Sequence, residues 1–294
     1  MAAIRELLKN AAAMLKDKSD TPVLDAELIF VEVCSRYNIA MDKIKLLAHG
    51  GSEIDEQVAG AFREEIFKRQ MGTPVQYITH KQEFMGLGLY VREGVLIPRP
   101  DTEVLVEEII KRYKFKRQLR LMDMCTGSGA IAVSLAYYLQ ASMVYAVDIS
   151  DAAIECTSVN IDNYDLGNRV KLVNSDMFGS LDIDEFGCLD VIASNPPYIP
   201  TPEIEKLSVN VKDYEPRLAL DGGVDGLSFY REIADKSWMY LNEGGMLFLE
   251  IGYNQAEEVK ALLAQSGHYC DIEIEKDLAG WDRVVFCKTK HGSY

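Results

Sequence analysis

From about residue 119 to residue 288, short apolar segments of strand length alternate with segments of helical pattern. The expected strands are residues 119–124, 143–148, 170–173, 189–194, 245–251 and 283–288. Apolar runs of this length are typical of strands buried on both faces, and strands that alternate with helices form parallel sheets. The alternation therefore predicts an α/β fold with helices on both faces of one sheet. Such sheets bind ligands beyond the carboxyl ends of their strands, where we expect the site residues.

The first 75 residues follow a helical pattern instead, because apolar residues recur three and four positions apart. Ser52 followed by Asp55 resembles a capping box that opens one of these helices. The sequence Gly-Thr-Pro at residues 72–74 is expected to end that helix. We therefore predict a helical domain over residues 1–75.

Two short apolar segments follow at residues 83–85 and 88–91, and glycine separates them. This pattern is typical of a β-hairpin. We predict a β-hairpin connector over residues 76–98 and a ligand-binding α/β domain over residues 99–294.

The chain of 294 residues carries a formal net charge of −15. Proteins that bind nucleic acid usually present a basic surface, so we expect no direct contact with nucleic acid. No apolar stretch is long enough to span a bilayer, and the first residues lack the layout of a signal peptide. We therefore expect a cytoplasmic protein without a membrane partner. The six cysteines form no CxxC pair and have no nearby histidine, so we expect no metal site.

The first expected strand of the α/β domain ends in a loop made of Cys125, Thr126, Gly127, Ser128 and Gly129. Glycine permits a tight turn, and it lets a ligand approach the bare backbone at the start of a helix. We expect all five residues to bind a cofactor.

Two nucleotide cofactors fit this loop. The spacing of Gly127, Gly129 and Ala132 also satisfies the dinucleotide fingerprint, so a nicotinamide-dependent oxidoreductase is one alternative. Asp123, just before the loop, could meet the ammonium group of a methionine moiety, whereas it would repel a pyrophosphate. This difference favours S-adenosylmethionine.

Three further side chains follow the next two strands. Asp148 ends the second strand, where its carboxylate can accept hydrogen bonds from both hydroxyls of a ribose. The alternative role for Asp148 is to cap the helix that follows. Asp176 and Met177 come just after the third strand, and we expect the acid to accept from the adenine amine and the thioether to cover the ring.

The fourth strand is followed by Asn195, Pro196, Pro197 and Tyr198. Consecutive prolines fix φ and lack an N–H group, so this turn exposes carbonyl oxygens on a rigid frame. The Asn195 side-chain oxygen and the Pro196 carbonyl can accept both hydrogens of a planar NH₂ group, and Tyr198 offers an aromatic wall. We predict that Asn195, Pro196 and Tyr198 are catalytic, that all four residues bind the acceptor group, and that Asn195 also borders the cofactor.

The nitrogen of a planar NH₂ group is a poor nucleophile because its lone pair is conjugated. Hydrogen bonds to both N–H groups draw the lone pair out of conjugation and direct it at the methyl group of the cofactor. No general base is needed before the attack, since the alkylated nitrogen becomes strongly acidic. The motif therefore predicts N-methylation of an amide or of an aromatic amine.

Several blocks of the sequence carry a resemblance to a known family. They are residues 96–103 (LIPRPDTE), the glycine loop, and residues 195–200 (NPPYIP), 215–223, 249–252 and 282–285. With these blocks the chain resembles the protein-(glutamine-N5) methyltransferases that act on peptide chain release factors. The resemblance is strong over residues 72–288 and looser in the helical N-terminal part.

The resemblance implies a class I methyltransferase (Rossmann-like) sheet whose last strand runs antiparallel, with a small helical domain that docks the release factor. It implies methylation of the glutamine in the Gly-Gly-Gln motif of that factor. A ribosomal-protein glutamine, or an amino group of adenine or guanine in nucleic acid, is the alternative acceptor. Cys125 departs from the family, which usually has glycine there, so we expect altered packing with retained cofactor binding.

Residues 199–226 form a long connection for a compact domain, which is typical of a functional cover or of a disordered segment. The turn at residues 221–223 and the Glu-Pro pair at residues 215–216 favour an ordered cover over the active site. Disorder without substrate is the alternative.

Overall fold

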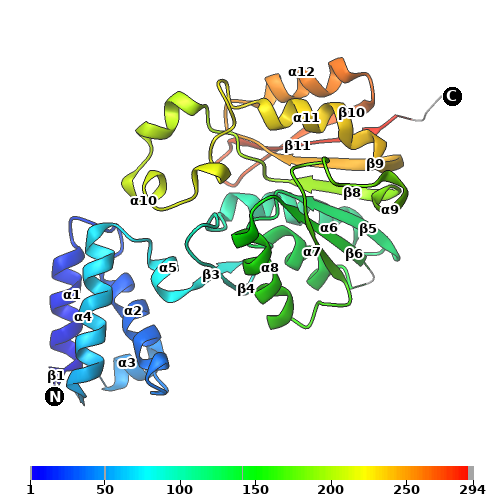
Figure 1. The fold of residues 1–294 in the computed structure, drawn as a ribbon. Helices are drawn as coiled ribbons and strands as arrows, with labels where there is room; N and C mark the ends of the chain where they lie inside the picture. Colours follow the sequence, from blue (N-terminus) through cyan, green and yellow to red (C-terminus); the bar gives the residue numbers. More distant parts are fainter. Residues whose placement is uncertain (1, 50, 141, 291–294) are drawn as a thin grey trace. The chain divides into compact units, whose positions relative to one another are not determined.

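The computed structural model describes residues 2–49, 51–140 and 142–290 (Figure 1). The predicted domain limits at residues 1 and 294 lie outside this part of the chain. Within it, no helix is both long enough and apolar enough to cross a membrane.

The chain is divided into two compact units. One unit comprises Met1–Lys81 and Ser208–Tyr214, and the other comprises Gln82–Leu207 and Glu215–Tyr294. A short segment from the predicted cover, residues 208–214, therefore belongs with the N-terminal helices.

The first unit is mainly helical, as its sequence pattern predicts. Its helices are α1 (Ile4–Leu15), α2 (Pro22–Arg36), α3 (Lys43–His49), α4 (Glu56–Met71), α5 (Val75–Thr79) and α10 (Val209–Lys212). Two strands of two residues each, β1 (Ala2–Ala3) and β2 (Glu53–Ile54), pair antiparallel and were not predicted.

Helix α4 shows how far local sequence signals define an element. The Asp55 side chain accepts a hydrogen bond from the Gln57 backbone N–H at 2.7 Å, so the capping residue is Asp55 and the prediction of Ser52 is wrong. The helix ends at Gly72, which has a φ of 115°, as the glycine signal predicts.

An ion pair lies inside this first unit. The Asp25 carboxylate and the Arg69 guanidinium meet at 2.7 Å, and their side chains are only 4% and 7% exposed. The hydroxyl groups of Ser19 and Thr21 also donate to Asp25, at 2.7 and 3.0 Å. The buried charge on Asp25 is therefore fully supplied with partners that tie the start of α2 to the end of α4.

The second unit is built on a seven-stranded sheet with the order β10-β11-β9-β8-β5-β6-β7. Its strands are β5 (Leu119–Met124), β6 (Ser142–Asp148), β7 (Val170–Asn174), β8 (Leu189–Ser194), β9 (Leu241–Glu250), β10 (Tyr269–Lys276) and β11 (Asp282–Thr289). Five neighbouring strands are parallel, and β11 runs antiparallel to β9 and β10. The expected antiparallel last strand is confirmed, whereas β10 was not predicted.

Helices cover both faces of this sheet (Figure 1). The longer ones are α6 (Glu103–Tyr113), α7 (Ala130–Tyr138), α8 (Asp151–Asn163), α11 (Ser228–Lys236) and α12 (Ala256–Ser266). The shorter ones are α9 (Ile183–Phe186), η1 (Pro100–Thr102), η2 (Thr201–Lys206), η3 (Arg217–Ala219) and η4 (Ser237–Met239). A hairpin of β3 (Lys81–Phe84) and β4 (Leu87–Tyr90) precedes the sheet in the chain, close to the predicted strands.

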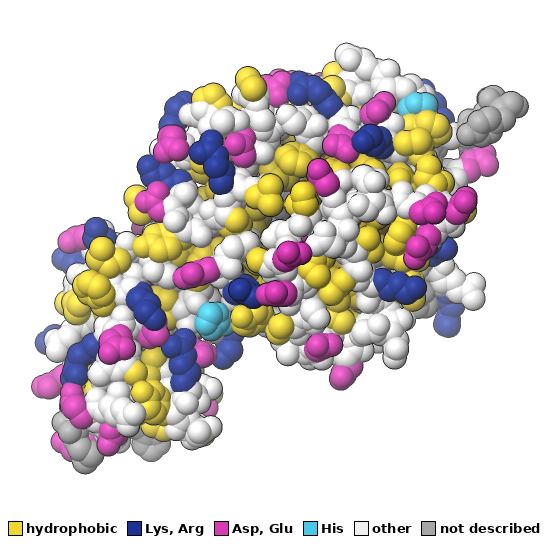
Figure 2. Space-filling view, in the orientation of Figure 1, with side chains coloured by type: hydrophobic (Ala, Val, Ile, Leu, Met, Phe, Trp, Pro, Cys, Tyr) yellow, Lys and Arg dark blue, Asp and Glu magenta, His cyan; other side chains and the backbone are white. Residues whose placement is uncertain are grey.

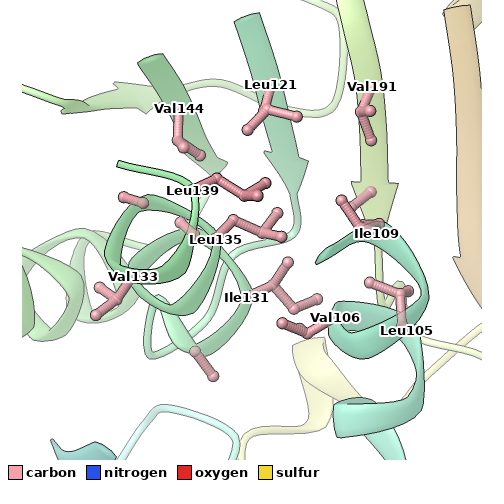
Figure 3. Close-up of a cluster of buried hydrophobic side chains, with 14 of the residues drawn as sticks. Leu105, Val106, Ile109, Leu121, Ile131, Val133, Leu135, Leu139, Val144 and Val191 are labelled. Carbon is pink, nitrogen blue, oxygen red and sulfur yellow. The ribbon is translucent and has the colours of Figure 1, made fainter. Parts of the chain in front are cut away.

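The strands contribute alternate residues to two buried clusters because successive side chains of a strand point to opposite faces. On one face, Leu121, Val144 and Val191 pack with side chains of α6 and α7 (Figure 3). On the other face, Met122 and Ile192 pack with side chains of α11 and α12. Both faces are apolar, and this explains the unbroken apolar runs in the sequence.

The charged side chains of the visible face are mixed. Figure 2 shows acidic and basic side chains interspersed on this face, with apolar atoms between them. The acidic side chains of this face are therefore not gathered into one region.

We expect Asp25→Ala to destabilise the helical unit by about 3–5 kcal/mol, because it leaves the Arg69 charge buried without its partner. Hydrogen–deuterium exchange of the amides in α2 and α4 would measure this loss. Glu56→Ala is the matched control, since the Glu56–Arg63 pair has the same length of 2.7 Å but is exposed to solvent. Equal effects of the two substitutions would contradict the importance of the buried pair.

Candidate active site

A cavity of about 280 Å³ opens in the second unit at the carboxyl ends of β5, β6 and β8. The parallel register pairs Met124 with Val147 on one side and with Ser194 on the other. The segments that follow these three strands therefore start at the same level of the sheet. Strand order also reverses at β5, and this is the place where such sheets bind ligands.

The loop after β5 presents its backbone to this cavity. Cys125, Thr126, Gly127 and Ser128 line the cavity. Gly129 does not line it, but it begins α7 with a φ of 79°. A Cβ atom on Gly129 would lie 2.6 Å from the Thr157 side chain, so only glycine fits there.

Asp148 lines the cavity and also builds the loop. One carboxylate oxygen accepts from the Gly127 backbone N–H and the other from that of Ser150, both at 2.9 Å. Burial raises the pKa of Asp148, while these two hydrogen bonds oppose the shift. The side chain that caps α8 is that of Ser150, which accepts from the Ala153 N–H, so the capping role for Asp148 is wrong and its ribose role stays a prediction.

Asp123 does not reach the cavity, which corrects the expectation that it meets a methionine ammonium group. Its side chain is fully buried, and one oxygen accepts from the Thr126 hydroxyl at 2.6 Å and from the Ala132 backbone N–H at 3.0 Å. Burial raises its pKa to about 7. Asp123 therefore joins the end of β5 to the first turn of α7 and shapes the loop from behind.

Asp176 and Met177, which follow β7, both line the cavity as expected of residues near an adenine. The Met177 sulfur lies 3.6 Å from the Cys125 sulfur, so two loops of the site touch through these side chains. Their contact gives the cavity an apolar, polarisable wall.

Only part of the motif after β8 faces the cavity. Asn195 and Pro197 line the cavity, whereas Pro196 and Tyr198 do not. The Asn195 side-chain nitrogen donates to the Thr102 hydroxyl at 3.2 Å, which leaves its oxygen for the cavity. Tyr198 packs against the buried cluster below α11 and α12, and its carbonyl accepts from the Gln255 amide at 3.0 Å.

Several residues near Asn195 were not predicted from the local sequence. Thr102 and Arg99 line the cavity, and Arg99 forms an ion pair with the buried Glu215. Three residues from the expected cover also line the cavity: Pro216, Leu218 and Ala219. The only signal for them was the family resemblance of residues 96–103 and 215–223, which gave these residues no separate role.

The comparisons with known proteins agree with this geometry. Residues 6–79 match the family model "PrmC N-terminal domain", and residues 99–210 match "Methyltransferase small domain". The release factor glutamine methyltransferase of Clostridium acetobutylicum is 40% identical over 282 residues, which are 96% of this chain and 97% of that protein. The protein of the same name from Moorella thermoacetica is 42% identical over 264 residues, 90% of each chain.

Solved structures show the same fold at low sequence identity. The hMettl16 catalytic domain, solved in complex with the MAT2A 3′UTR hairpin 6, has a TM-score of 0.56 at 16% identity and covers 78% of this chain and 83% of its own. A methyltransferase from Pyrococcus furiosus has a TM-score of 0.50 at 17% identity, over 70% of this chain and 91% of its own. 

The fold and the site define a class I methyltransferase that uses S-adenosylmethionine. The sheet order, the glycine loop and the acid at the end of β6 are all in place for it. Given its relatives, the chain belongs to the release factor glutamine methyltransferase family.

The residues of the cavity fit this cofactor. When bound, S-adenosylmethionine supplies an electrophilic methyl group on a positively charged sulfur. Asp148 and Asp176 line the cavity and would offer acceptor oxygens to ribose and adenine, and the Gly127 backbone is open to close approach. Carboxylates beside the cavity also suit a cationic ligand better than a pyrophosphate.

We expect Asp148→Ala to weaken S-adenosylmethionine binding by roughly 1–3 kcal/mol, because a charged acceptor is lost. Isothermal titration of the purified protein measures the affinity. Asp151→Ala, an exposed acid on the first turn of α8, is the control and should bind normally. An unchanged affinity of the Asp148 variant would remove the ribose assignment.

Proposed function

We propose that this protein transfers a methyl group from S-adenosylmethionine to the side-chain amide nitrogen of the glutamine in the Gly-Gly-Gln motif of peptide chain release factors. The names of its relatives support this acceptor. The observation that carries the proposal is the orientation of Asn195, whose amide nitrogen is held by Thr102 at the wall of the cavity. An oxygen acceptor is thereby available where an amide NH₂ group must be bound.

We assign the chemistry to four residues. The Asn195 oxygen at the cavity wall accepts one N–H group of the glutamine amide, and the carbonyl of Pro196, which lies just outside the cavity lining, accepts the other. The lone pair of the amide is thereby released from conjugation and directed at the methyl group. Pro197 makes the turn rigid. Tyr198 packs into the buried cluster beside the cavity and does not line it, so we assign it to exclude water from behind the turn that holds the planar acceptor. Burial keeps its phenol neutral, since it raises the pKa well above the usual value.

We also propose that residues 1–75 dock the release factor, that residues 76–98 connect the two parts, and that residues 99–294 form the methyltransferase domain. Two large apolar side chains, Phe67 and Met71, lie one turn apart on α4 and are 58% and 61% exposed. Such exposed neighbours are typical of a protein-binding surface. A cytoplasmic location would place the enzyme with this substrate, and the cysteines in the described residues are all free thiols.

We expect Asn195→Ala to lower methyl transfer by about 10²–10³-fold, because one preorganised acceptor for the transition state is lost. Single-turnover transfer to a release factor, with mass spectrometry to locate the methyl group, measures this. Wild-type enzyme is also incubated separately with release factor, with ribosomal protein and with nucleic acid. We expect methylation only in the reaction that contains release factor, and there on the glutamine. A methyl group on a base, on a ribosomal protein or on another side chain would overturn the proposed function.

We expect the double substitution Phe67→Ser with Met71→Ser to raise KM for the whole release factor without changing the turnover of a short Gly-Gly-Gln peptide. The reason is that only the whole factor is long enough to reach the helical unit. Steady-state kinetics with both substrates separate the two effects, and Ile44→Ser, at an 80% exposed position of α3, is the control. Equal loss with both substrates would refute docking on α4.

A further inference from the structure

A buried acid, Glu250, lies next to Asn195 at the edge of the sheet. Glu250 is the last residue of β9, and the parallel register pairs Ser194 of β8 with Leu249 of β9. Asn195 and Glu250 therefore leave their strands side by side. Glu250 is only 1% exposed and is not among the residues that line the cavity.

The side chains of Thr102 and Asn195 lie beside the Glu250 carboxyl group, and hydrogen bonding toward them lowers its pKa. Its second oxygen, Oε2, is buried and has no hydrogen-bond partner among the described residues. Leaving a buried carboxylate oxygen unpaired is costly, so such a group calls for a functional explanation.

The contacts fix the direction of the Asn195 amide. The Thr102 hydroxyl oxygen accepts from the Asn195 side-chain nitrogen at 3.2 Å, so its one hydrogen is free to turn toward Glu250. One N–H group of Asn195 is thus used by Thr102, and the carboxyl group of Glu250 is the acceptor nearby for the other. The Asn195 oxygen is left as the part of the amide that faces the cavity.

We propose that Glu250 is a positioning residue for methyl transfer, which holds the Asn195 oxygen toward the acceptor amide both directly and through Thr102. This inference rests on the proposed function of Asn195. The arrangement requires the ionised carboxylate, since a protonated acid would donate its own hydrogen and compete for the Asn195 oxygen. A carboxylate also draws electron density toward the amide oxygen by polarising the N–H groups.

The surroundings of Glu250 make the ionisation of its carboxyl group dependent on pH near neutrality. Burial raises its pKa to about 7, against the hydrogen bonds from Thr102 and Asn195 and the charge of Arg283. The Asp101 carboxylate raises it further. The phenols of Tyr198 and Tyr230 also lie near Glu250, but burial raises their pKa values, so both stay neutral near pH 7. Activity should therefore fall as the pH drops below about 7 and Glu250 takes up a proton.

The test is Glu250→Gln, which keeps the size of the side chain but replaces one acceptor oxygen with an NH₂ donor. We expect turnover at pH 8 to fall by about 10²-fold, the scale expected when a reacting group is misplaced. We also expect unchanged affinity for S-adenosylmethionine, an unchanged melting temperature, and loss of the decline below pH 7. Glu258→Gln, an exposed position on α12, should behave as wild type.

A second pair of variants tests the path through Thr102. Thr102→Val keeps the shape and removes the hydroxyl, whereas Thr102→Ser keeps the hydroxyl. We expect the serine variant to retain much more activity than the valine variant. Equal activity of the valine and serine variants would overturn the positioning role. So would a wild-type rate and pH profile of Glu250→Gln, or a loss of the fold or of the cofactor affinity in that variant.

A measurement without the methyl acceptor separates this inference from the proposed function. The ¹⁵N resonance of the Asn195 side-chain NH₂ group, assigned by its loss in Asn195→Asp, should titrate near pH 7 in wild-type protein and stay constant in Glu250→Gln. Absence of this titration in the wild type would overturn the inference. Failure of wild-type enzyme to methylate the release factor would instead overturn the proposed function.

Discussion

Backbone hydrogen bonds hold β5 in parallel register with β6 on one side and with β8 on the other. Because of this register, the cofactor loop, Asp148 and Asn195 all start from one edge of the sheet. A shift of one strand by one residue would turn its buried side chains to the opposite face, so the two apolar clusters hold the register in place. The energy of the core therefore fixes the geometry of the site, although few core side chains touch the cavity.

Carboxylates occupy three positions near this edge: Asp123, Asp148 and Glu250. Burial raises the pKa of each, and the pKa of Asp123 and of Glu250 reaches about 7. Each carboxylate accepts hydrogen bonds that orient a neighbour: α7 and Thr126, the backbone of the loop, or Asn195. Of the three, only Asp148 lines the cavity, and its carboxylate would repel the phosphates of a dinucleotide but attract the positive charge of a sulfonium. This physical difference separates two cofactors whose glycine signatures look alike.

The sequence was informative where function depends on neighbours in the chain. The glycine loop, Asp148 and Asn195 could be found because each directly follows an apolar run. Local sequence could not reveal that Thr102, 93 positions before Asn195, binds its amide, because that contact exists only after the sheet forms. The prediction that Asp123 faces the ligand was wrong for a related reason. The side to which an acid at a strand end points depends on how the strand packs, and local sequence does not show this. The strand β10 was missed because it lies at the sheet edge, where only Tyr269 of its residues is buried.

Cys125 shows how the site tolerates a departure from glycine. It has a φ of 63°, and Met177 across the cavity wall has a φ of 47°, so both adopt the left-handed region that costs about 1–2 kcal/mol per residue. Each is held by its surroundings: the Thr126 N–H donates to the Val147 carbonyl at 3.0 Å, and the Ser175 hydroxyl donates to the Met177 carbonyl at 2.9 Å. The contact between the two sulfur atoms fills space that glycine would leave open. Packing thus offsets the strain of the unusual backbone. At Cys125, only the backbone needs to adopt the conformation that a glycine would adopt.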